Sequence, residues 1–100
     1  MRSSEVFEPH VGSAFVVAPS QRCDPVTLEL VRIIDRSNTQ VEAYSLMFLG
    51  PKAGCFDQGI QEMTHAELGT LSMFLTPILS PGLGEHLIRY EAVFSRLRSR

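Results

Sequence analysis

Short segments in which hydrophobic and polar residues alternate recur along this chain, with turn-forming residues between them. Glycine, proline, serine and asparagine punctuate it at intervals of roughly 8–15 residues, a rhythm typical of short strands joined by turns. Alternation of apolar and polar residues is the period of a β-strand with one buried face. Five segments are predicted to be strands: Ser13–Ala18, Val26–Ile34, Val41–Leu49, Gly59–His65 and Thr70–Ile78.

Three of these segments carry additional signals. In Val26–Ile34 the apolar residues change parity after Leu30, which indicates either a β-bulge or a strand buried on both faces. Val41–Leu49 is largely apolar on both faces near its end, which predicts a central strand. Pro77, near the end of the fifth segment, predicts that regular pairing stops there or that this end lies on a sheet edge.

The two ends of the chain carry different signals. Residues 83–97 fit a strand and a helix equally well, because their apolar residues satisfy both spacings. Near the start, Ser4 can cap one helical turn within Ser4–Val11, and Glu5 suits the beginning of such a turn. We expect an N-terminal segment at residues 1–12, a single β domain at 13–95 and a basic tail at 96–100.

About six short strands in so short a chain predict an all-β fold. Since the connections are short, the pairing should be mainly antiparallel. Closure into a small barrel, or packing of two sheets face to face, would bury both faces of the central strand and remove exposed edges. The prediction is therefore a small antiparallel barrel or two-sheet sandwich with a short N-terminal helical turn.

Composition and charge argue against a nucleic-acid partner and against insertion into a membrane. With 44% hydrophobic and 20% charged residues the chain can form a core, and its net charge of −2 argues against a nucleic-acid partner. No apolar stretch approaches the roughly 20 residues of a membrane-spanning helix, so no membrane insertion is expected. No secretory signal is visible at the start, so we expect cytoplasmic synthesis, after which the protein could enter a particle or an exported assembly.

Several short motifs occur in a set order along the chain. They are Phe7-x-Pro9-His10-Val11-Gly12, Phe48-x-Gly50-Pro51, Gln58-Gly59, His65-x-x-Leu68-Gly69 and Tyr90-Glu91-Ala92-Val93-Phe94. As a set they resemble an uncharacterised family of small bacterial proteins, often encoded beside phage-tail-collar or tail-fibre-like proteins. The resemblance implies a small all-β domain, favours a strand for the last segment and implies no catalytic residue. Ile60 and Ser95 depart from the family pattern, which usually has an aromatic residue and an asparagine there.

The histidines are the natural candidates for a general base. His65 directly precedes a turn at residues 66–69, so its ring is expected to bond backbone groups of that turn. His10 is expected to act in the same way at the entry to the first strand, and His86 to be solvated. We therefore predict structural roles for these side chains and no catalytic residue.

The two cysteines are expected to be free thiols. Cys55 has Asp57 nearby, and together with His65 it could form the nucleophile and base of a hydrolase. This is the least favoured of the possible functions. Lys52 is the one cationic residue near this cysteine that could activate its thiol. Cys23 has no visible partner, and no Cys/His cluster has the spacing of a metal site, so neither a metal nor another cofactor is expected.

Glycines and a basic segment complete the list of motifs. Gly50, Gly54, Gly59 and Gly69 lack the Lys-Ser/Thr of a phosphate-binding loop, so we expect them in turns that need positive φ. Residues 96–100 carry three arginines, and a solvated terminus is favoured there over a contact with an anionic partner.

A domain of this size buries only about 60–65% of its extended surface, so some apolar residues should stay outside. We expect an exposed interface patch, although a core buried on both faces would also accommodate the same residues. The candidates are Met47, Leu49, Phe56, Met63 and Met73.

The leading hypothesis is a non-enzymatic structural or protein-interaction domain that binds itself or a larger, tail-like or fibre-like assembly. Burial of an apolar patch and pairing of strand edges would supply the contact. The alternative is a small-ligand-binding barrel with a pocket between the Gly50–Gly59 loop and the strand ends, lined by Phe48, Phe56 and Phe74.

Overall fold

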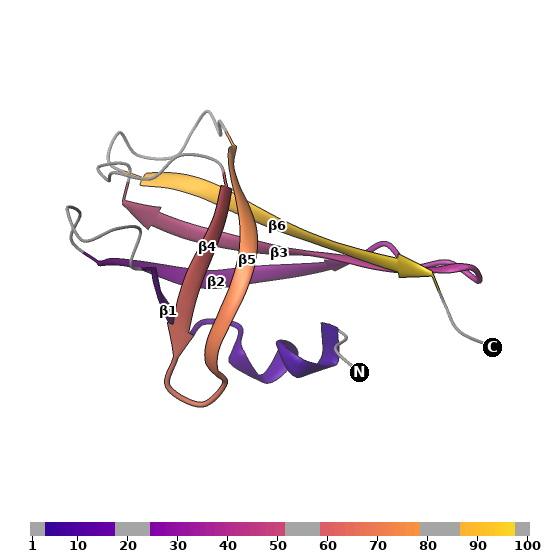
Figure 1. Ribbon diagram of the computed structural model, residues 1–100, viewed down its shortest axis with the longest axis horizontal. Helices are drawn as coiled ribbons and strands as arrows, with labels where there is room; N and C mark the ends of the chain where they lie inside the picture. The colour runs from indigo at the N-terminus through magenta and orange to yellow at the C-terminus, as the bar shows by residue number, and fades with distance from the viewer. Residues whose placement is uncertain (1–3, 18–24, 52–58, 79–86, 98–100) are drawn as a thin grey trace.

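The computed structural model describes residues 4–17, 25–51, 59–78 and 87–97 (Figure 1). Two single turns of 3-10 helix come first, η1 (Ser4–Val6) and η2 (Glu8–His10). Six strands follow: β1 (Ala14–Val17), β2 (Val26–Asp35), β3 (Val41–Pro51), β4 (Gly59–His65), β5 (Gly69–Ile78) and β6 (Leu87–Leu97). The predicted all-β class and the predicted N-terminal helical turn are confirmed.

The strands close into a single barrel. Their order is β1-β2-β3-β6-β5-β4, and every pairing is antiparallel. Of the two predicted architectures, the structure has the barrel. The last segment is a strand, as the resemblance implied, because β6 pairs with β3 along its whole length. The predicted central strand is also confirmed, since β3 lies between β2 and β6.

Strand β5 forms the corner of the barrel by changing partners. Its residues from Gly69 to Leu75 pair with β4, and those from Thr76 to Ile78 pair with β6. Pro77 lies opposite Tyr90, beyond the point where pairing with β4 stops. A proline is tolerated there because one side of the strand no longer needs an N–H donor.

The change of parity in β2 is a β-bulge. Leu30 pairs with Phe48 and Arg32 pairs with Met47, so Val31 is the extra residue in β2. A bulge bends the strand and increases its twist, which helps a small sheet to close. One of the two explanations for the sequence pattern is thereby confirmed.

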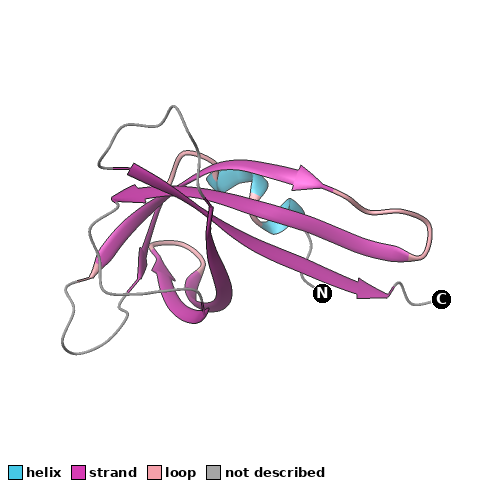
Figure 2. Cartoon of the chain, turned by 90° about the horizontal axis from the view of Figure 1, so that it is seen from above, coloured by secondary structure: helices cyan, strands magenta, loops and turns pink. Residues whose placement is uncertain are grey.

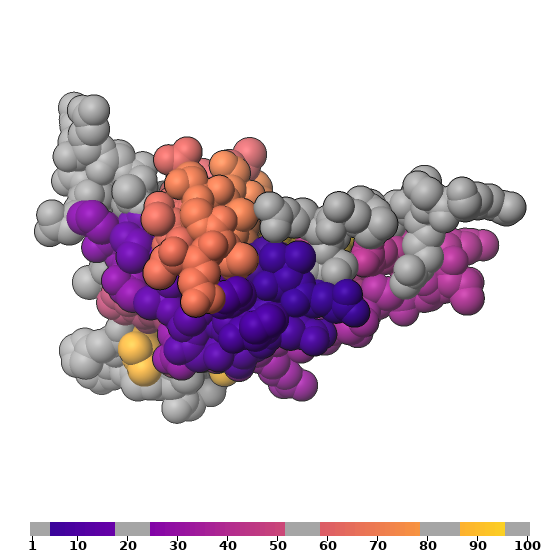
Figure 3. Space-filling model, turned by 90° about the horizontal axis from the view of Figure 1, so that it is seen from below, coloured from indigo at the N-terminus to yellow at the C-terminus, as the bar shows by residue number. Residues whose placement is uncertain are grey.

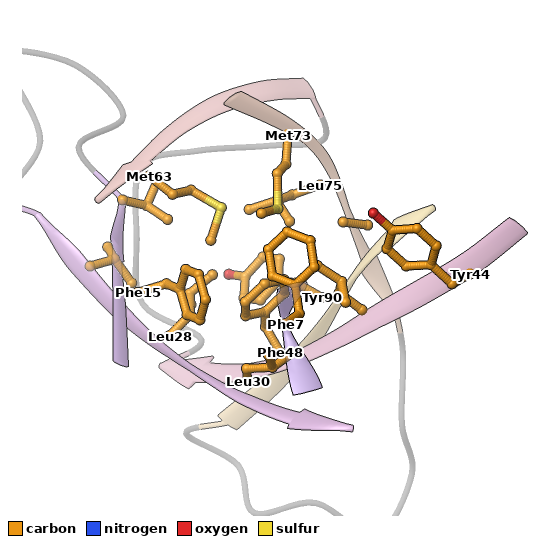
Figure 4. Packing of buried hydrophobic residues seen from close by; sticks show 14 residues of the cluster. Phe7, Phe15, Leu28, Leu30, Tyr44, Phe48, Met63, Met73, Leu75 and Tyr90 are labelled. Atoms are coloured by element: carbon orange, nitrogen blue, oxygen red, sulfur yellow. The ribbon is translucent and has the colours of Figure 1, made fainter. Parts of the chain in front are cut away.

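The barrel interior is filled by side chains from every strand (Figure 4). Phe15 and Phe48 are fully buried and meet edge to face, with ring centroids 5.2 Å apart. The N-terminal segment contributes as well, because Phe7 is 3% exposed and lies 6.2 Å from the rings of both Tyr44 and Phe94. The described part of residues 1–12 therefore packs as part of the β domain.

The N-terminal segment lies along the turn between β4 and β5, where Figure 3 shows the indigo chain against the orange strands. At the other end of the chain, β6 continues to Leu97, so the first two residues of the expected basic tail belong to a strand. No described helix is long and apolar enough to cross a membrane.

Gly50 lies within β3 and not in a turn. A Cβ atom at this position would lie 2.2 Å from Cδ2 of Leu28, which is fully buried. The glycine is needed because Leu28 occupies the space of a side chain, so the expected turn role is wrong for Gly50. Gly69, the first residue of β5 after the turn that follows β4, has the expected positive φ, at 78°.

Candidate functional site

The ring of His65 holds the turn that follows it. Its Nδ1 accepts hydrogen bonds from the backbone N–H of Glu67, at 3.0 Å, and of Leu68, at 3.2 Å. The side chain is 5% exposed, and these bonds satisfy two N–H groups that the turn would otherwise leave unpaired. The structural role predicted for His65 is confirmed.

These bonds also fix the position of the ring proton. Because Nδ1 accepts two hydrogen bonds, a neutral ring carries its proton on Nε2. Nε2 lies 2.9 Å from Oγ of Ser13 and donates to it, and that hydroxyl donates to the backbone carbonyl of His10. His65 therefore has no lone pair available to accept the Ser13 proton, so the two side chains are not arranged as a nucleophile and its base.

His10 is part of the same cluster but contributes in a different way. Its ring meets that of His65 edge-on, with centroids 4.6 Å apart, and its Nδ1 lies 3.4 Å from a carboxylate oxygen of the exposed Glu67. The strand entry itself is held by the His10 backbone carbonyl, which accepts from the N–H and the hydroxyl of Ser13. The expected contact at the strand entry is present, but the backbone makes it and not the ring.

The remaining candidates for chemistry lie elsewhere. Cys23, Cys55 and His86, together with Lys52 and Asp57, fall outside the described residues. Within the described ranges no group of three or more histidine, cysteine or acidic residues is placed to hold a metal ion.

Two predicted interface residues belong to the core. Met63 on β4 is fully buried and Met73 on β5 is 3% exposed, and both side chains point into the barrel (Figure 4). Their expected exposure is wrong. Both lie at inward positions of their strands. In the β4–β5 ladder Met63 pairs with Leu71 and Met73 pairs with Gln61.

The other predicted interface residues lie on or near the outer face of β3. Met47 is only 9% exposed, so its expected exposure is wrong as well. It lies between Arg32 and Glu91 on the neighbouring strands, whose long side chains can cover it. Leu49 is partly buried, and Phe56 lies outside the described residues.

The apolar side chains that do remain outside are different ones. Ile60 on β4 is 74% exposed and Phe74 on β5 is 49% exposed, and the two residues face each other in the ladder. They form an apolar pair on the outer wall of the barrel, called the β4–β5 patch below. Val93 on the outer face of β6 is 59% exposed.

Strand parity would have found these residues. Ile60 alternates out of phase with the buried Met63, Phe74 out of phase with Met73, and Val93 falls among the polar positions of its strand. An apolar residue at a polar position of a strand faces the solvent. Side-chain type alone, which favoured the methionines, was the weaker signal.

The part of β6 beyond the barrel corner has an open edge. Among the described residues β6 pairs with β5 from Arg89 to Glu91, whereas its pairing with β3 extends to Leu97. Among the described strands none pairs with the side of Ala92–Leu97 that faces away from β3, and this stretch is called the β6 edge below. Figure 2 shows the strand that leads to the C-terminus on the outside of the sheet.

The lining expected for a ligand pocket is not brought together. Phe48 is fully buried inside the barrel, whereas Phe74 faces outward from β5. The two rings therefore lie on opposite sides of the barrel wall and do not line one cavity. Most of the Gly50–Gly59 loop, including Phe56, lies outside the described residues.

Comparisons with known proteins identify the family of this chain. No curated protein and no solved structure matches it. One family model matches residues 3–94, which is nearly the whole chain and agrees with the extent of the resemblance to an uncharacterised family. The chain therefore belongs to the family described as a domain of unknown function, DUF6916.

Proposed function

We propose that this protein is a non-enzymatic protein-interaction domain that serves as a structural or accessory component of a larger protein assembly. The observation that carries the proposal is the β4–β5 patch, in which Ile60 and Phe74 face each other on the outer wall of the barrel. An aromatic and a β-branched residue that lie opposite each other on neighbouring strands stabilise a sheet, and a partner protein that covers the pair adds to this stabilisation.

The energetic argument concerns hydration of the patch. Complete burial of an isoleucine or phenylalanine side chain contributes about 1.5–3 kcal/mol. In the single chain Ile60 is mostly exposed and Phe74 is half exposed, so a partner that covers them gains part of this energy. Apolar residues gathered in this way on an outer surface are typical of protein contacts.

The arrangement around His65 supports a domain without catalysis. Its ring nitrogens hold a turn and an adjacent serine, and both are thereby occupied with structural hydrogen bonds. The tail-like or fibre-like character of the assembly rests on the family resemblance alone and is part of the proposal.

A photo-crosslinking experiment tests the proposal. Ser72 lies on the exposed face of β5 beside Phe74, so a photoreactive amino acid at position 72 samples the β4–β5 patch. In cells that naturally produce the protein we expect a discrete crosslinked species, which is lost in the double variant Ile60→Ser/Phe74→Ser. The same probe at the exposed Thr27 on β2 is the matched control.

The double variant should stay folded and lose no more than about 1 kcal/mol of stability, because Ile60 is mostly exposed and Phe74 is half exposed. A probe at position 72 that yields no adduct beyond the control position contradicts the proposal. An adduct that persists in the double variant contradicts it too.

A further inference from the structure

We propose that the β6 edge pairs with the same edge of a second copy of this chain, in antiparallel orientation about a two-fold axis. The inference rests on the proposed interaction function and names one surface and one partner for it. The contact would join the two molecules into a continuous sheet with the order β2-β3-β6-β6-β3-β2.

The geometry of the edge fits such a contact. Six residues, Ala92–Leu97, extend beyond the last pair with β5, a length of about 20 Å at the rise of a β-strand. Figure 1 shows β2, β3 and β6 continuing together past the point where β5 turns away. Every second residue of this stretch directs its N–H and C=O away from β3, where an incoming strand can bond them.

A second copy can pair with the β6 edge so that side chains on the same face of the sheet lie opposite each other. Residues directly opposite in an antiparallel ladder have side chains on the same face, so the two-fold axis must place one residue of β6 opposite its own copy. We place Phe94, near the middle of the β6 edge, opposite its copy. Val93 of each copy then lies opposite Ser95 of the other, and the two exposed Val93 side chains are diagonal neighbours on the outer face of the joint.

Charge also favours a second copy. Residues 96–100 carry three arginines and no acidic residue, so with a total of −2 the preceding 95 residues carry −5. With Phe94 opposite its copy, the position of Arg96 lies opposite Ala92 of the second copy, one residue from Glu91, so the ends of the paired stretch carry opposite charges.

The residue types of the β6 edge also suit pairing with a further strand. Proteins commonly guard an open edge with an inward charge, a proline or a covering loop. Arg96 is the one charged residue of the β6 edge, and the four residues before it are alanine, valine, phenylalanine and serine. These residues suit a strand that is paired on both sides.

The test uses the purified full chain in size-exclusion chromatography with light scattering over a concentration series. The parent should move from 11.1 kDa towards about twice that mass as concentration rises. Val93→Lys and Val93→Glu should each stay at the lower mass, because like charges then meet at the joint. An equimolar mixture of the two variants should recover the higher mass, since opposite charges meet in the mixed pair.

Ile60→Lys is the matched control, because it places the same charge on an exposed strand position of the β4–β5 patch. It should pair like the parent. A parent that stays monomeric throughout the series overturns the inference, as does a Val93→Lys variant that pairs like the parent. A mass that grows beyond two copies overturns it as well.

Failure of pairing between two copies can be distinguished from failure of the proposed interaction function. Hydrogen exchange reports on the backbone amides of residues 92–97 directly. If these amides are protected only when a different protein is added, the partner is not a second copy, while the interaction function stands. Crosslinking through position 72 is likewise independent of pairing between two copies.

Discussion

The Nε2 atom of His65 lies 2.9 Å from the Oγ atom of Ser13, across a separation of 52 residues in sequence. The pair ties the beginning of β1 to the end of β4, next to the two ladder pairs that close the barrel between these strands. Because the same ring also holds the β4–β5 turn, one side chain links the closure of the barrel to the geometry of its neighbouring turn.

Substitutions at this pair should separate its two roles. Ser13→Ala leaves the Nε2 proton without a partner and should lower the free energy of unfolding by about 1–2 kcal/mol. His65→Ala removes all three bonds and should cost more, about 2–4 kcal/mol. His65→Asn keeps an acceptor for the turn and should fall nearer the serine variant. Urea unfolding of the purified variants measures the order.

Glu67→Ala is the control for this series. Its carboxylate is exposed and lies 3.4 Å from His10, so its loss should change the free energy of unfolding by no more than about 0.5 kcal/mol. A His65→Ala variant as stable as the parent would show that the cluster does not support the fold.

Gly50 and Leu28 should behave as one coupled unit. Gly50→Ala places a methyl group where Cδ2 of Leu28 now lies and should destabilise the protein by about 1–3 kcal/mol. Leu28→Ala vacates that space but leaves a cavity, so the double variant should lose less than the sum of the two single variants. A thermal-unfolding double-mutant cycle measures the coupling, and strict additivity would contradict the predicted contact.

Two serines should respond in opposite ways to loss of their hydroxyl groups. Ser45 is fully buried and its Oγ has no hydrogen-bond partner among the described residues, so Ser45→Ala should leave stability unchanged or raise it by up to about 1 kcal/mol. Ser37 donates to the carbonyl of Ala43 and accepts from its N–H. Ser37→Ala should therefore be destabilising, by about 1 kcal/mol. Equal effects of the two variants in urea unfolding would refute this distinction.

Stability should fall at alkaline pH through Tyr90. Burial raises the pKa of the Tyr90 phenol above its ordinary value of 10.0, because the phenolate would lose its hydration. The folded state therefore holds the proton more tightly than the unfolded state. This contribution to stability is fully present below pH 10 and is lost as the pH rises through the higher pKa of the folded state.

Tyr90→Phe provides the comparison for this effect. It should flatten the decline of the unfolding free energy above pH 10 relative to the parent, measured by urea unfolding across alkaline pH. Tyr90→Phe and parent curves of equal slope would contradict the assignment.

Sequence reasoning succeeded wherever a local pattern has a direct structural cause. The change of parity after Leu30 indicated a bulge or burial of both faces, and the bulge is present, because an extra residue in a strand shifts every later side chain to the other face. The position of His65 directly before a turn predicted its bonds to that turn, because these partners are two and three residues away. The β-strand period also located the strands to within two residues at their described ends.

The surface was harder to predict, because exposure depends on what neighbouring strands supply. Met47 lies at an outward position of β3 but is covered, because β3 is central and has long side chains on both sides. Ile60 and Phe74 were detectable as apolar residues at polar positions, yet only the β4–β5 register shows that they face each other. Residue type alone favoured Met63 and Met73, which the barrel buries.

Local sequence pattern was enough for the first five strands and the turn around His65, because each follows from residues within a few positions of one another. It left two explanations each for the change of parity in β2 and for the last segment. Tertiary structure alone decided that the sheet closes as a barrel, that Ser13 meets His65 and that Leu28 takes the space beside Gly50. It also decided that β6 continues past its neighbour β5. These features depend on which strands become neighbours and in which register, and pairing between distant segments is set by packing of the whole core.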